Sequence, residues 1–216
     1  MSEQVEKSRS IRKRDPDASR ERILKAATAE FAEKGFGDAR VDEIARRAGI
    51  NKRMLYHYFG NKDELFQAVL EEIYDTICFS GQSLDFDSMS PRDGLMALVD
   101  FVWNYYLANP ESIRLLNTEN LHDARHLRSS KRARDMHPPF ETAIDNLMRR
   151  GVEAKVFHSG IDPVDLYVTI VSMVYYYLSN SATLSVAFGR DLRAPDQIAR
   201  WHNQVRDVIG RYVLVN

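Results

Sequence analysis

The sequence predicts an all-α protein of about nine helices, the first three of them in an N-terminal domain. Apolar residues recur every three to four positions, as one buried face of an α-helix requires, and no segment alternates apolar and polar residues as a half-buried strand would. Glycine or proline stands where the periodic segments end. With 216 residues the chain can bury a sizeable core, and it suits two modest domains or one large one.

The N-terminal segment is predicted to be a flexible arm. Residues 1–16 combine several Lys and Arg with almost nothing apolar. The first helix then begins at Asp17 or Ser19 and ends at Gly35, with Phe36 as the apolar residue just beyond. Its inward-facing residues are Ile23, Ala27 and Phe31.

Residues 41–66 predict two short helices joined by a tight turn, and then the start of a longer helix. The first short helix has one apolar stripe at helical spacing, made of Val41, Ile44, Ala45 and Ala48. Gly49 follows, where a chain leaving a helix turns into the left-handed region at little steric cost. Asn51 is a good N-cap for the second short helix.

The second short helix has a buried side and a basic, aromatic side. Leu55 and Phe59 point inward. The residues on its free face are Lys52, Arg53, Tyr56 and His57. This combination is typical of a helix-turn-helix that reads DNA. Taken alone, the pattern would favour an ordinary helical hairpin with a solvated basic face.

The string IARRAGINKRMLYHYFGNKDELF closely resembles the signature of TetR-type transcriptional repressors. That signature runs from an Ile-Ala pair through Ala-Gly and Leu-Tyr to an aromatic-Phe pair, and then to Lys and Leu. Its positions in this chain are Ile44-Ala45, Ala48-Gly49, Leu55-Tyr56, Tyr58-Phe59, Lys62 and Leu65. The resemblance is strong over residues 17–75, and beyond them it rests on length and helix pattern. Arg40 departs from the family, which usually has a Thr or Ser there to cap the second helix.

Six residues are candidates for DNA contact: Asn51, Lys52, Arg53, Tyr56, His57 and Lys62. Lys52 and Arg53, at the start of their helix, can reach guanine acceptors or phosphates. The resemblance implies that Tyr56 touches a backbone phosphate, and that Lys62 binds phosphate together with the first amides of its helix. His57 could contact a base or a phosphate.

The charge distribution agrees in sign with DNA binding by the N-terminal domain. Residues 1–66 hold 15 Lys+Arg against 12 Asp+Glu, a net charge of +3, while the remainder holds 15 against 19, a net charge of −4. The arm could lie along the minor groove, or it could be an idle terminus. Arg46 and Arg47 are predicted to be solvated surface residues.

A long connecting helix is predicted to start at Lys62, because Asn61 and Glu64 have the spacing of a capping box. Its apolar residues repeat every four positions and form a seam of Leu65, Val69, Ile73 and Ile77. This gives a DNA-binding domain over residues 17–78, followed by a loop over residues 79–90. The resemblance implies that residues 79–216 form a helical domain for ligand binding and dimerisation.

The chain is again helical from Pro91. Pro91–Leu107 is apolar on more than one face and is predicted to be a central helix, ended by Asn109-Pro110. A short helix over Glu111–Leu121 follows. Because two prolines cannot lie mid-helix without a kink, the next regular helix is predicted to start near Pro138-Pro139 and to end at Gly151. The basic segment between them holds Arg125, Arg128, Lys131, Arg132 and Arg134.

The last two helices begin at Asp162-Pro163 and at Pro195-Asp196. Leu166–Gly189 contains no charged residue, and a bilayer-spanning helix takes about 20 residues. However, Ser, Thr and Asn interrupt this segment and no basic cluster flanks it on one side, so burial between protein surfaces is the preferred interpretation. The final helix is predicted to bury Ile198, Trp201, Val205, Val208 and Tyr212.

These two helices present more apolar surface than one small domain can cover. They predict a homodimer with a four-helix interface. An Asp at Val174 or Val205 is expected to weaken that dimer if the side chain faces the partner.

The resemblance also implies a small-molecule pocket within the C-terminal helices. The candidates are polar residues on helices that should otherwise be apolar, together with aromatic walls: Trp103, Asn104, Asn117, Asn120, His137, Phe140, Tyr177 and Asn180. Each could instead be a satisfied core residue or an interface contact. Their polar and aromatic mix suits a small organic compound with hydrogen-bonding groups.

His122 and His126 have the i, i+4 spacing that can hold a metal on one helix face. No HExxH motif or cysteine partner accompanies them, so no metal is predicted, and a solvated, basic helix end is the preferred interpretation. The single cysteine, Cys78, excludes an internal disulfide framework and a cysteine-rich zinc site.

No enzyme motif is present: the chain has no GxSxG, phosphate loop or GxGxxG, and no cofactor is predicted. No secretory signal follows the charged N-terminus, which predicts a cytoplasmic protein. We therefore expect a dimeric transcriptional regulator that a small organic effector releases from a palindromic DNA operator, and a repressor is the preferred interpretation. The alternative is a helix-turn-helix regulator without such an effector, and a helical enzyme has the least support.

Overall fold

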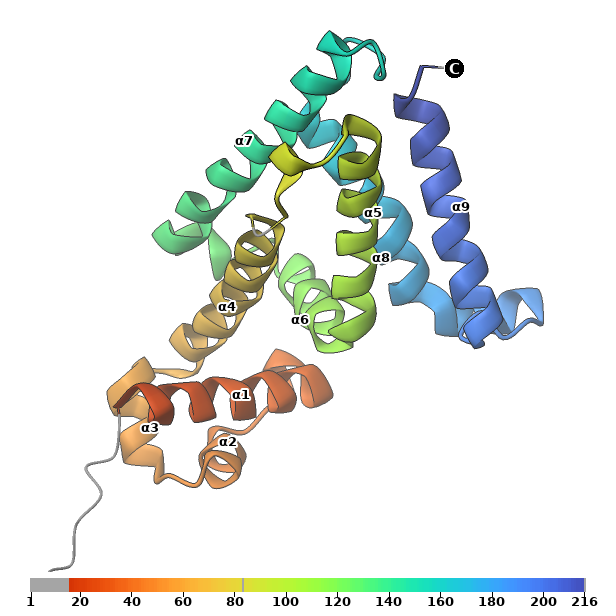
Figure 1. The fold of residues 1–216 in the computed structure, drawn as a ribbon. Helices are drawn as coiled ribbons and strands as arrows, with labels where there is room; N and C mark the ends of the chain where they lie inside the picture. The colour runs from red at the N-terminus through yellow and green to blue at the C-terminus, as the bar shows by residue number, and fades with distance from the viewer. Residues whose placement is uncertain (1–15, 83, 216) are drawn as a thin grey trace, which may run out of the picture.

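The computed structural model describes residues 16–82 and 84–215, without the side chains of residues 82, 133 and 136–138. Within these residues the protein is all-α, as predicted, with two short 3-10 turns and one isolated bridge between Phe157 and Leu214. Apart from Pro16, the predicted arm lies outside the described residues. Figure 1 shows α1, α2 and α3 as a block at one end of the molecule, joined to the remaining helices by α4.

The N-terminal block consists of α1 (Pro16–Asp38), α2 (Val41–Ala48) and α3 (Lys52–Phe59). The predicted break at Gly35 is confirmed, because this residue has φ 72° and ψ 172° inside the helical segment. Ile23, Ala27 and Phe31 are buried, as their spacing predicted. Phe36, just beyond the break, packs on the rings of Phe31 and Phe66.

Helix α4 (Lys62–Gln82) runs from this block into the C-terminal helices. Its predicted apolar seam is confirmed, since Leu65, Val69, Ile73 and Ile77 are all buried. The predicted loop from Phe79 is wrong for its first four residues, where the helix continues. Gly81, a loop signal in sequence, instead permits a close helix contact, because a Cβ there would lie 2.4 Å from the ring of Phe140.

The C-terminal part contains five α-helices and two 3-10 turns among the described residues: η1 (Phe86–Ser88), α5 (Pro91–Ala108), α6 (Pro110–Leu121), η2 (Leu127–Ser129), α7 (Lys131–Glu153), α8 (Pro163–Phe188) and α9 (Pro195–Val213). The predicted starts of α5, α8 and α9 at prolines are confirmed. Asp162 caps α8 by accepting hydrogen bonds from the amides of Val164 and Asp165.

The predicted start of the seventh helix is wrong. Helix α7 begins at Lys131 and continues through Pro138-Pro139. A proline inside a helix costs about 3 kcal/mol, but burying a large apolar side chain stabilises by about 1.5–3 kcal/mol. Four such side chains follow directly on α7 and offset this cost: Phe140, Ile144, Leu147 and Met148.

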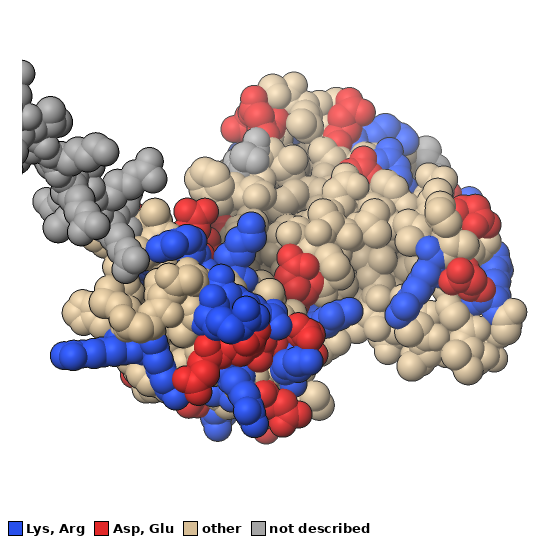
Figure 2. Space-filling model, turned by 90° about the horizontal axis from the view of Figure 1, so that it is seen from below, with Lys and Arg blue, Asp and Glu red and all other residues tan. Residues whose placement is uncertain are grey.

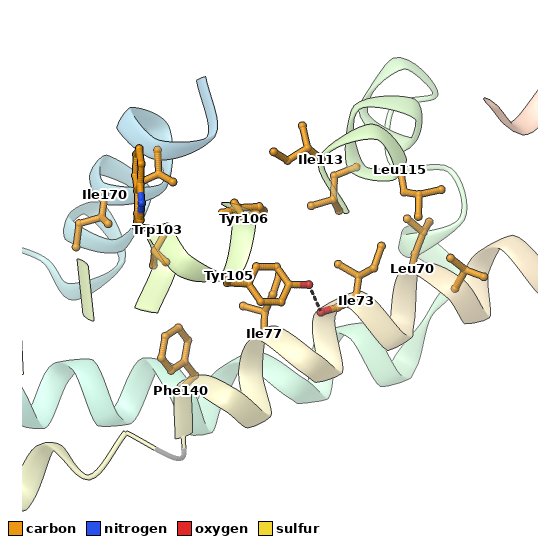
Figure 3. Packing of buried hydrophobic residues seen from close by; sticks show 14 of the residues in the cluster. Leu70, Ile73, Ile77, Trp103, Tyr105, Tyr106, Ile113, Leu115, Phe140 and Ile170 are labelled. Atoms are coloured by element: carbon orange, nitrogen blue, oxygen red, sulfur yellow. Dashed lines mark hydrogen bonds between the residues drawn. The ribbon is translucent and has the colours of Figure 1, made fainter. Parts of the chain in front are cut away.

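Helix α5 is central, as predicted, and packs against α4, α6, α7, α8 and α9. Figure 3 shows this interior, with Trp103, Tyr105 and Tyr106 of α5 lying among residues of α4, α6, α7 and α8. The Tyr105 hydroxyl donates to the carbonyl of Ile73 on α4. The core therefore joins α4 directly to the C-terminal helices.

Helices α8 and α9 each bury only one side in the single chain. The predicted burial is confirmed for Val205, but Val208 and Tyr212 are 36% and 48% exposed, because α9 turns Ile209 and Val213 inward instead. Val174 and Val205 are 0% exposed in the single chain, so neither side chain faces outward. No helix in the described part of the chain combines the length and apolar character needed to cross a bilayer.

Candidate nucleic-acid interface

The turn between α2 and α3 has the geometry that its sequence predicted. Gly49 adopts φ 65° and ψ 37°, and the amide of Ile50 donates to the Ala45 carbonyl over 3.0 Å. Asn51 then caps α3, with its Oδ1 accepting a hydrogen bond from the Met54 amide at 2.8 Å. The angle between the two short helices is thus fixed by local contacts and by a shared core.

Helix α3 presents the predicted set of side chains to solvent. Leu55 and Phe59 are buried, whereas Asn51, Lys52, Arg53, Tyr56 and His57 are exposed. Figure 2 views the N-terminal block from the side away from the C-terminal helices, where Lys and Arg gather with Asp and Glu among them. An exposed recognition-type helix on a charge-rich face that the C-terminal helices leave open can enter a groove of DNA.

Lys52 and Arg53 differ in their surroundings. The Lys52 ammonium pairs with Asp42 of α2 at 3.0 Å and lies 5.9 Å from the centroid of the Tyr56 ring. The hydrogen bond to Asp42 raises the pKa of Lys52 and keeps it charged. Arg53 has no ion pair with any residue in the described ranges. Arg53 is therefore the cation that can reach DNA without breaking a contact.

Lys62 lies at the start of α4 but points back to α1. Its Nζ donates to the Gly37 carbonyl at 3.0 Å and lies 5.0 Å from the centroid of the Phe36 ring. The predicted cap by Asn61 is confirmed, because its Oδ1 accepts from the Glu64 amide at 2.9 Å. The Glu64 carboxylate accepts from the side-chain amide of Asn61 at 2.9 Å and not from its backbone amide, so the predicted capping box is only half formed. An ammonium has three donors, so the contact with Gly37 leaves Lys62 able to bind a phosphate.

Arg46 and Arg47 pair with acids instead of being simply solvated. Both donate to Glu43, and these hydrogen bonds lower the Glu43 pKa to about 2. Arg47 also reaches Glu30 and Glu33 on α1. Arg40 offers no side-chain cap to α2, as its sequence predicted. Its own amide donates at 3.2 Å to Glu30, a buried residue that sequence reasoning missed because it comes from another helix.

The eight residues predicted to line a ligand pocket do not converge on one cavity. Trp103 stacks on His202, and Tyr177 stacks on Trp201 and donates to the Leu192 carbonyl, so both rings are core residues. Asn104, Asn117 and Asn120 are exposed, and Asn117 joins α6 to Ser179 of α8. Asn180 donates to its own helix. The side chain of His137 is outside the described part.

Two of the predicted residues border pockets, and the pockets are different: Tyr177 lines one together with Trp201 between α8 and α9, and Phe140 lines another. The pocket beside Phe140 has a volume of about 170 Å³ and is lined by Phe140, Glu141, Ile144, Pro163, Val164 and Tyr167. The rings of Phe140 and Tyr167 meet edge to face at 5.3 Å between centroids. All six lining residues belong to α7 or α8, so this pocket lies between these two helices.

Sequence reasoning missed a group of tyrosines from α4, α5 and α8, of which Tyr105 and Tyr106 are buried and Tyr74, Tyr167 and Tyr175 are partly buried. The Tyr106 ring contacts those of Tyr105 and Tyr175 edge to face, with centroids 5.2 and 5.3 Å apart. Burial raises the pKa of Tyr106 and Tyr167, and that of Tyr175 to about 12. The signal in the sequence is five tyrosines on segments predicted to be buried helices.

The two histidines do not share a helix face. Helix α6 ends at Leu121, and Asp123 and Ala124 have φ of 53° and 56°. The interpretation of a solvated helix end is wrong for His126, which is 4% exposed and contacts Glu119 through Nδ1 at 2.6 Å. His122 contacts the Thr118 carbonyl. Among the described residues, no three metal-ligating side chains form a group that could hold an ion.

Comparisons with known proteins agree across both parts of the chain. The profile of bacterial regulatory proteins of the tetR family matches residues 23–69, and that of tetracyclin repressor-like C-terminal domains matches residues 91–209. The chain is 35% identical to the HTH-type transcriptional repressor NicS of Pseudomonas putida, over 93% of this chain and 95% of NicS. It is also 35% identical to the HTH-type transcriptional repressor SCO4008 of Streptomyces coelicolor, over 74% and 78% of the two chains.

A solved structure shares the fold. The crystal structure of the putative transcriptional regulator SCO4942 from Streptomyces coelicolor superposes with a TM-score of 0.66. It covers 90% of this chain and 98% of that chain at 22% identity, so the likeness concerns the fold alone.

Proposed function

We propose, starting from the fact that this chain belongs to the TetR family of helix-turn-helix transcriptional repressors, that it acts as a homodimer on a palindromic DNA operator and is released by a small organic effector. The observation that carries the proposal is the exposed face of α3, with Arg53 unpaired among the described residues. The C-terminal helices leave this face open.

The proposed DNA contacts divide into two kinds. Arg53 and Lys52 lie at the start of α3, where side chains of a recognition helix meet base edges, and Arg can bind guanine through two hydrogen bonds. Tyr56 and Lys62 would contact phosphates and fix the orientation of the domain. His57 and the exposed Asn51 complete the face, although the side-chain oxygen Oδ1 of Asn51 already caps α3.

The proposed dimer interface uses the outward sides of α8 and α9. Their exposed apolar residues are Val164, Val168, Tyr176, Val186, Phe188, Val208 and Tyr212. Monomeric proteins rarely expose large apolar patches to water. Two copies of this helix pair can cover these side chains around a twofold axis. This surface replaces the buried Val174 and Val205 as the place to test dimerisation.

The proposed effector site is the pocket beside Phe140 and Tyr167, extended toward Tyr106. The surroundings are apolar and aromatic, as small-molecule sites usually are. The hydroxyl groups of Tyr106 and Tyr167 make no hydrogen bond with other residues in the ranges described here. They can therefore orient a compound with hydrogen-bonding groups.

The test is selection of binding sites from random duplex DNA with the full-length protein. We expect an imperfect palindrome whose half-site centres are roughly 34–36 Å apart, because a twofold dimer places two recognition helices in successive major grooves. Affinity should fall steeply between two salt concentrations. Recovery of unrelated sequences with no repeated half-site would contradict the proposal. A selected palindrome whose affinity no compound in a metabolite screen alters would favour the regulator without an effector.

A further inference from the structure

The outer face of α4 carries a regular series of polar residues that the DNA-reading surface does not use. Asp63, Gln67, Glu71 and Asp75 recur every four residues and therefore share one side of the helix. The seam of Leu65, Val69, Ile73 and Ile77 lies on the buried side. Helix α4 can therefore pack into the core through its apolar seam and form polar contacts with another segment through its polar stripe.

The segment between α6 and α7 meets this stripe in order. Arg125 donates to Asp63 at 2.6 Å, Ser129 to Gln67 at 3.2 Å and Ser130 to Glu71 at 2.6 Å. Arg132 pairs with Asp75. Four successive turns of α4 thus each contact at least one residue of 125–132. We call these contacts the α4 ladder.

A buried carboxylate shapes the segment that carries the ladder. Glu119 at the end of α6 is 1% exposed, and its Oε1 accepts from the amides of His126 and Leu127 at 2.7 and 2.9 Å. Its Oε2 contacts Nδ1 of His126 at 2.6 Å. Because Asp123 and Ala124 adopt left-handed backbone angles, which are unfavourable outside glycine, the turn needs such contacts to keep its shape.

The ladder ends beside the DNA-reading surface. The ring of Phe36 lies between Lys62 and Arg125, whose cationic groups are 5.0 and 5.4 Å from its centroid. The His126 ring packs on the same ring at 4.9 Å. The C-terminal part therefore contacts the N-terminal block next to Lys62, the residue predicted to bind a DNA phosphate.

We infer that the α4 ladder, organised by Glu119, positions the N-terminal block on the C-terminal body and so sets the spacing of the two recognition helices for a palindromic operator. Asp63, Arg125, His126 and Glu119 are then positioning residues that need not touch DNA. This inference rests on the proposed function, since spacing matters only to a dimer that reads two half-sites. If only a fraction of the dimers has the spacing that fits the palindrome, the apparent affinity for the palindrome falls in proportion to that fraction.

The experiment compares two duplexes, the selected palindrome and the same duplex with one half-site scrambled. Arg125→Gln should weaken binding to the palindrome about fivefold and leave the single half-site within about twofold, because one reader does not depend on spacing. Asp63→Asn should lower the ratio of the two affinities by a similar factor. The double variant should lower it no further, since both changes remove one contact.

Matched variants separate positioning from folding and from DNA contact. Arg128→Gln changes a basic residue of the same segment that is exposed and outside the ladder, so the ratio should stay as in the unsubstituted protein. Arg53→Ala should weaken both duplexes. Glu119→Gln keeps one acceptor for the two amides and should lower the ratio more than Arg125→Gln. Melting curves of every variant check that the fold is retained.

Two outcomes would overturn the inference in distinguishable ways. If Arg53→Ala weakens binding while Arg125→Gln and Glu119→Gln leave the ratio unchanged, the ladder does not position the readers and the DNA-binding proposal stands. If the unsubstituted protein binds the palindrome and the single half-site equally well, both proposals fail together.

Discussion

The cationic side chains of α3 and α4 differ in the contacts that they make. Lys52 is paired with Asp42, Lys62 rests on Phe36 and the Gly37 carbonyl, and Arg53 has no such partner among the described residues. To bind DNA, Lys52 would exchange its ion pair with Asp42 for a phosphate or base contact, whereas Lys62 can keep its hydrogen bond to Gly37. The net gain from Lys52 should therefore be smaller than from an unpaired cation, because the broken ion pair offsets part of it.

Substitution of Arg53 and Lys62 should separate base reading from phosphate binding. Arg53→Ala should cost about 1–3 kcal/mol on the operator and less on random DNA, because a bidentate guanine contact is lost. Lys62→Ala should weaken all sequences alike and make the salt slope shallower by roughly one unit. Filter binding or fluorescence anisotropy at several salt concentrations measures both. Identical behaviour of the two variants would refute this division.

The buried and partly buried tyrosines make stability depend on alkaline pH. The pKa of Tyr175 is about 12 in the folded protein, against about 10 in an unfolded chain. A raised pKa stabilises the fold fully below pH 10, and this contribution is lost as the pH rises toward 12. Circular dichroism melts should therefore show a melting temperature that falls over this range. In Tyr175→Phe the fall should be smaller, and an unchanged pH dependence would argue against this residue.

At the scale of helices, one face of a helix packs tightly in the core while its opposite face exposes apolar side chains. Gly81 lets α4 approach Phe140 of α7, and the buried seams of α8 and α9 tie them to α5. The opposite faces of α8 and α9 carry apolar residues that meet only water in one chain. The fold therefore depends on one side of these helices, and the proposed dimer on the opposite side.

Gly81→Ala should destabilise the protein by about 1–3 kcal/mol. The added Cβ would lie 2.4 Å from the Phe140 ring, and relieving that overlap requires a shift of packed helices. Gly37→Ala is the matched control, since a Cβ there meets no atom within 4 Å, and its effect should be close to zero. Denaturant melts of the two variants measure the difference. Equal stabilities would show that α4 and α7 are not tightly packed at this point.

Substitutions on the two faces of α8 should have contrasting effects. Tyr176→Asp places a charge on the exposed face and should give a folded monomer at micromolar concentration by light scattering. Val174→Asp buries an unpaired charge and should cost about 3–5 kcal/mol of folding stability. A stable monomer of the unsubstituted protein at the same concentration would sink the dimer proposal.

For the whole molecule, the DNA-reading block and the C-terminal part meet along α4, which both parts share, and where α1 packs on α6. Helix α4 belongs to the core of both, and the α4 ladder fixes its outer face. In the proposed dimer, a compound that prefers a differently tilted α4 would change the spacing of the two recognition helices. Thermodynamic linkage then requires operator and compound to weaken each other by the same factor.

Reciprocal titrations test this coupling. A compound found by thermal shift should raise the operator dissociation constant by a factor equivalent to about 1–3 kcal/mol, and operator should raise the dissociation constant of the compound equally. Tyr167→Phe should weaken the compound while leaving operator binding unchanged in its absence. A compound that binds the C-terminal helices and leaves operator affinity unaltered would refute the switch.

The amino-acid sequence by itself determined the helix-turn-helix, because its signals are local. Gly49 needs left-handed angles, Asn51 caps the helix that follows it, and the apolar spacing assigns Leu55 and Phe59 to the core. Prolines likewise marked the starts of α5, α8 and α9. The candidate DNA-contacting residues could be chosen from the same short window, since one helix face presents most of them.

The tertiary structure alone decided features that join residues distant in the chain. Helix α7 continues through Pro138-Pro139 because four large apolar side chains beyond the prolines are buried, and Gly81 lies in a helix because Phe140 approaches it. The burial of His126 depends on Glu119 and on Phe36. No spacing along the sequence encodes such pairs, because their energies arise from contacts that exist only once the helices have packed.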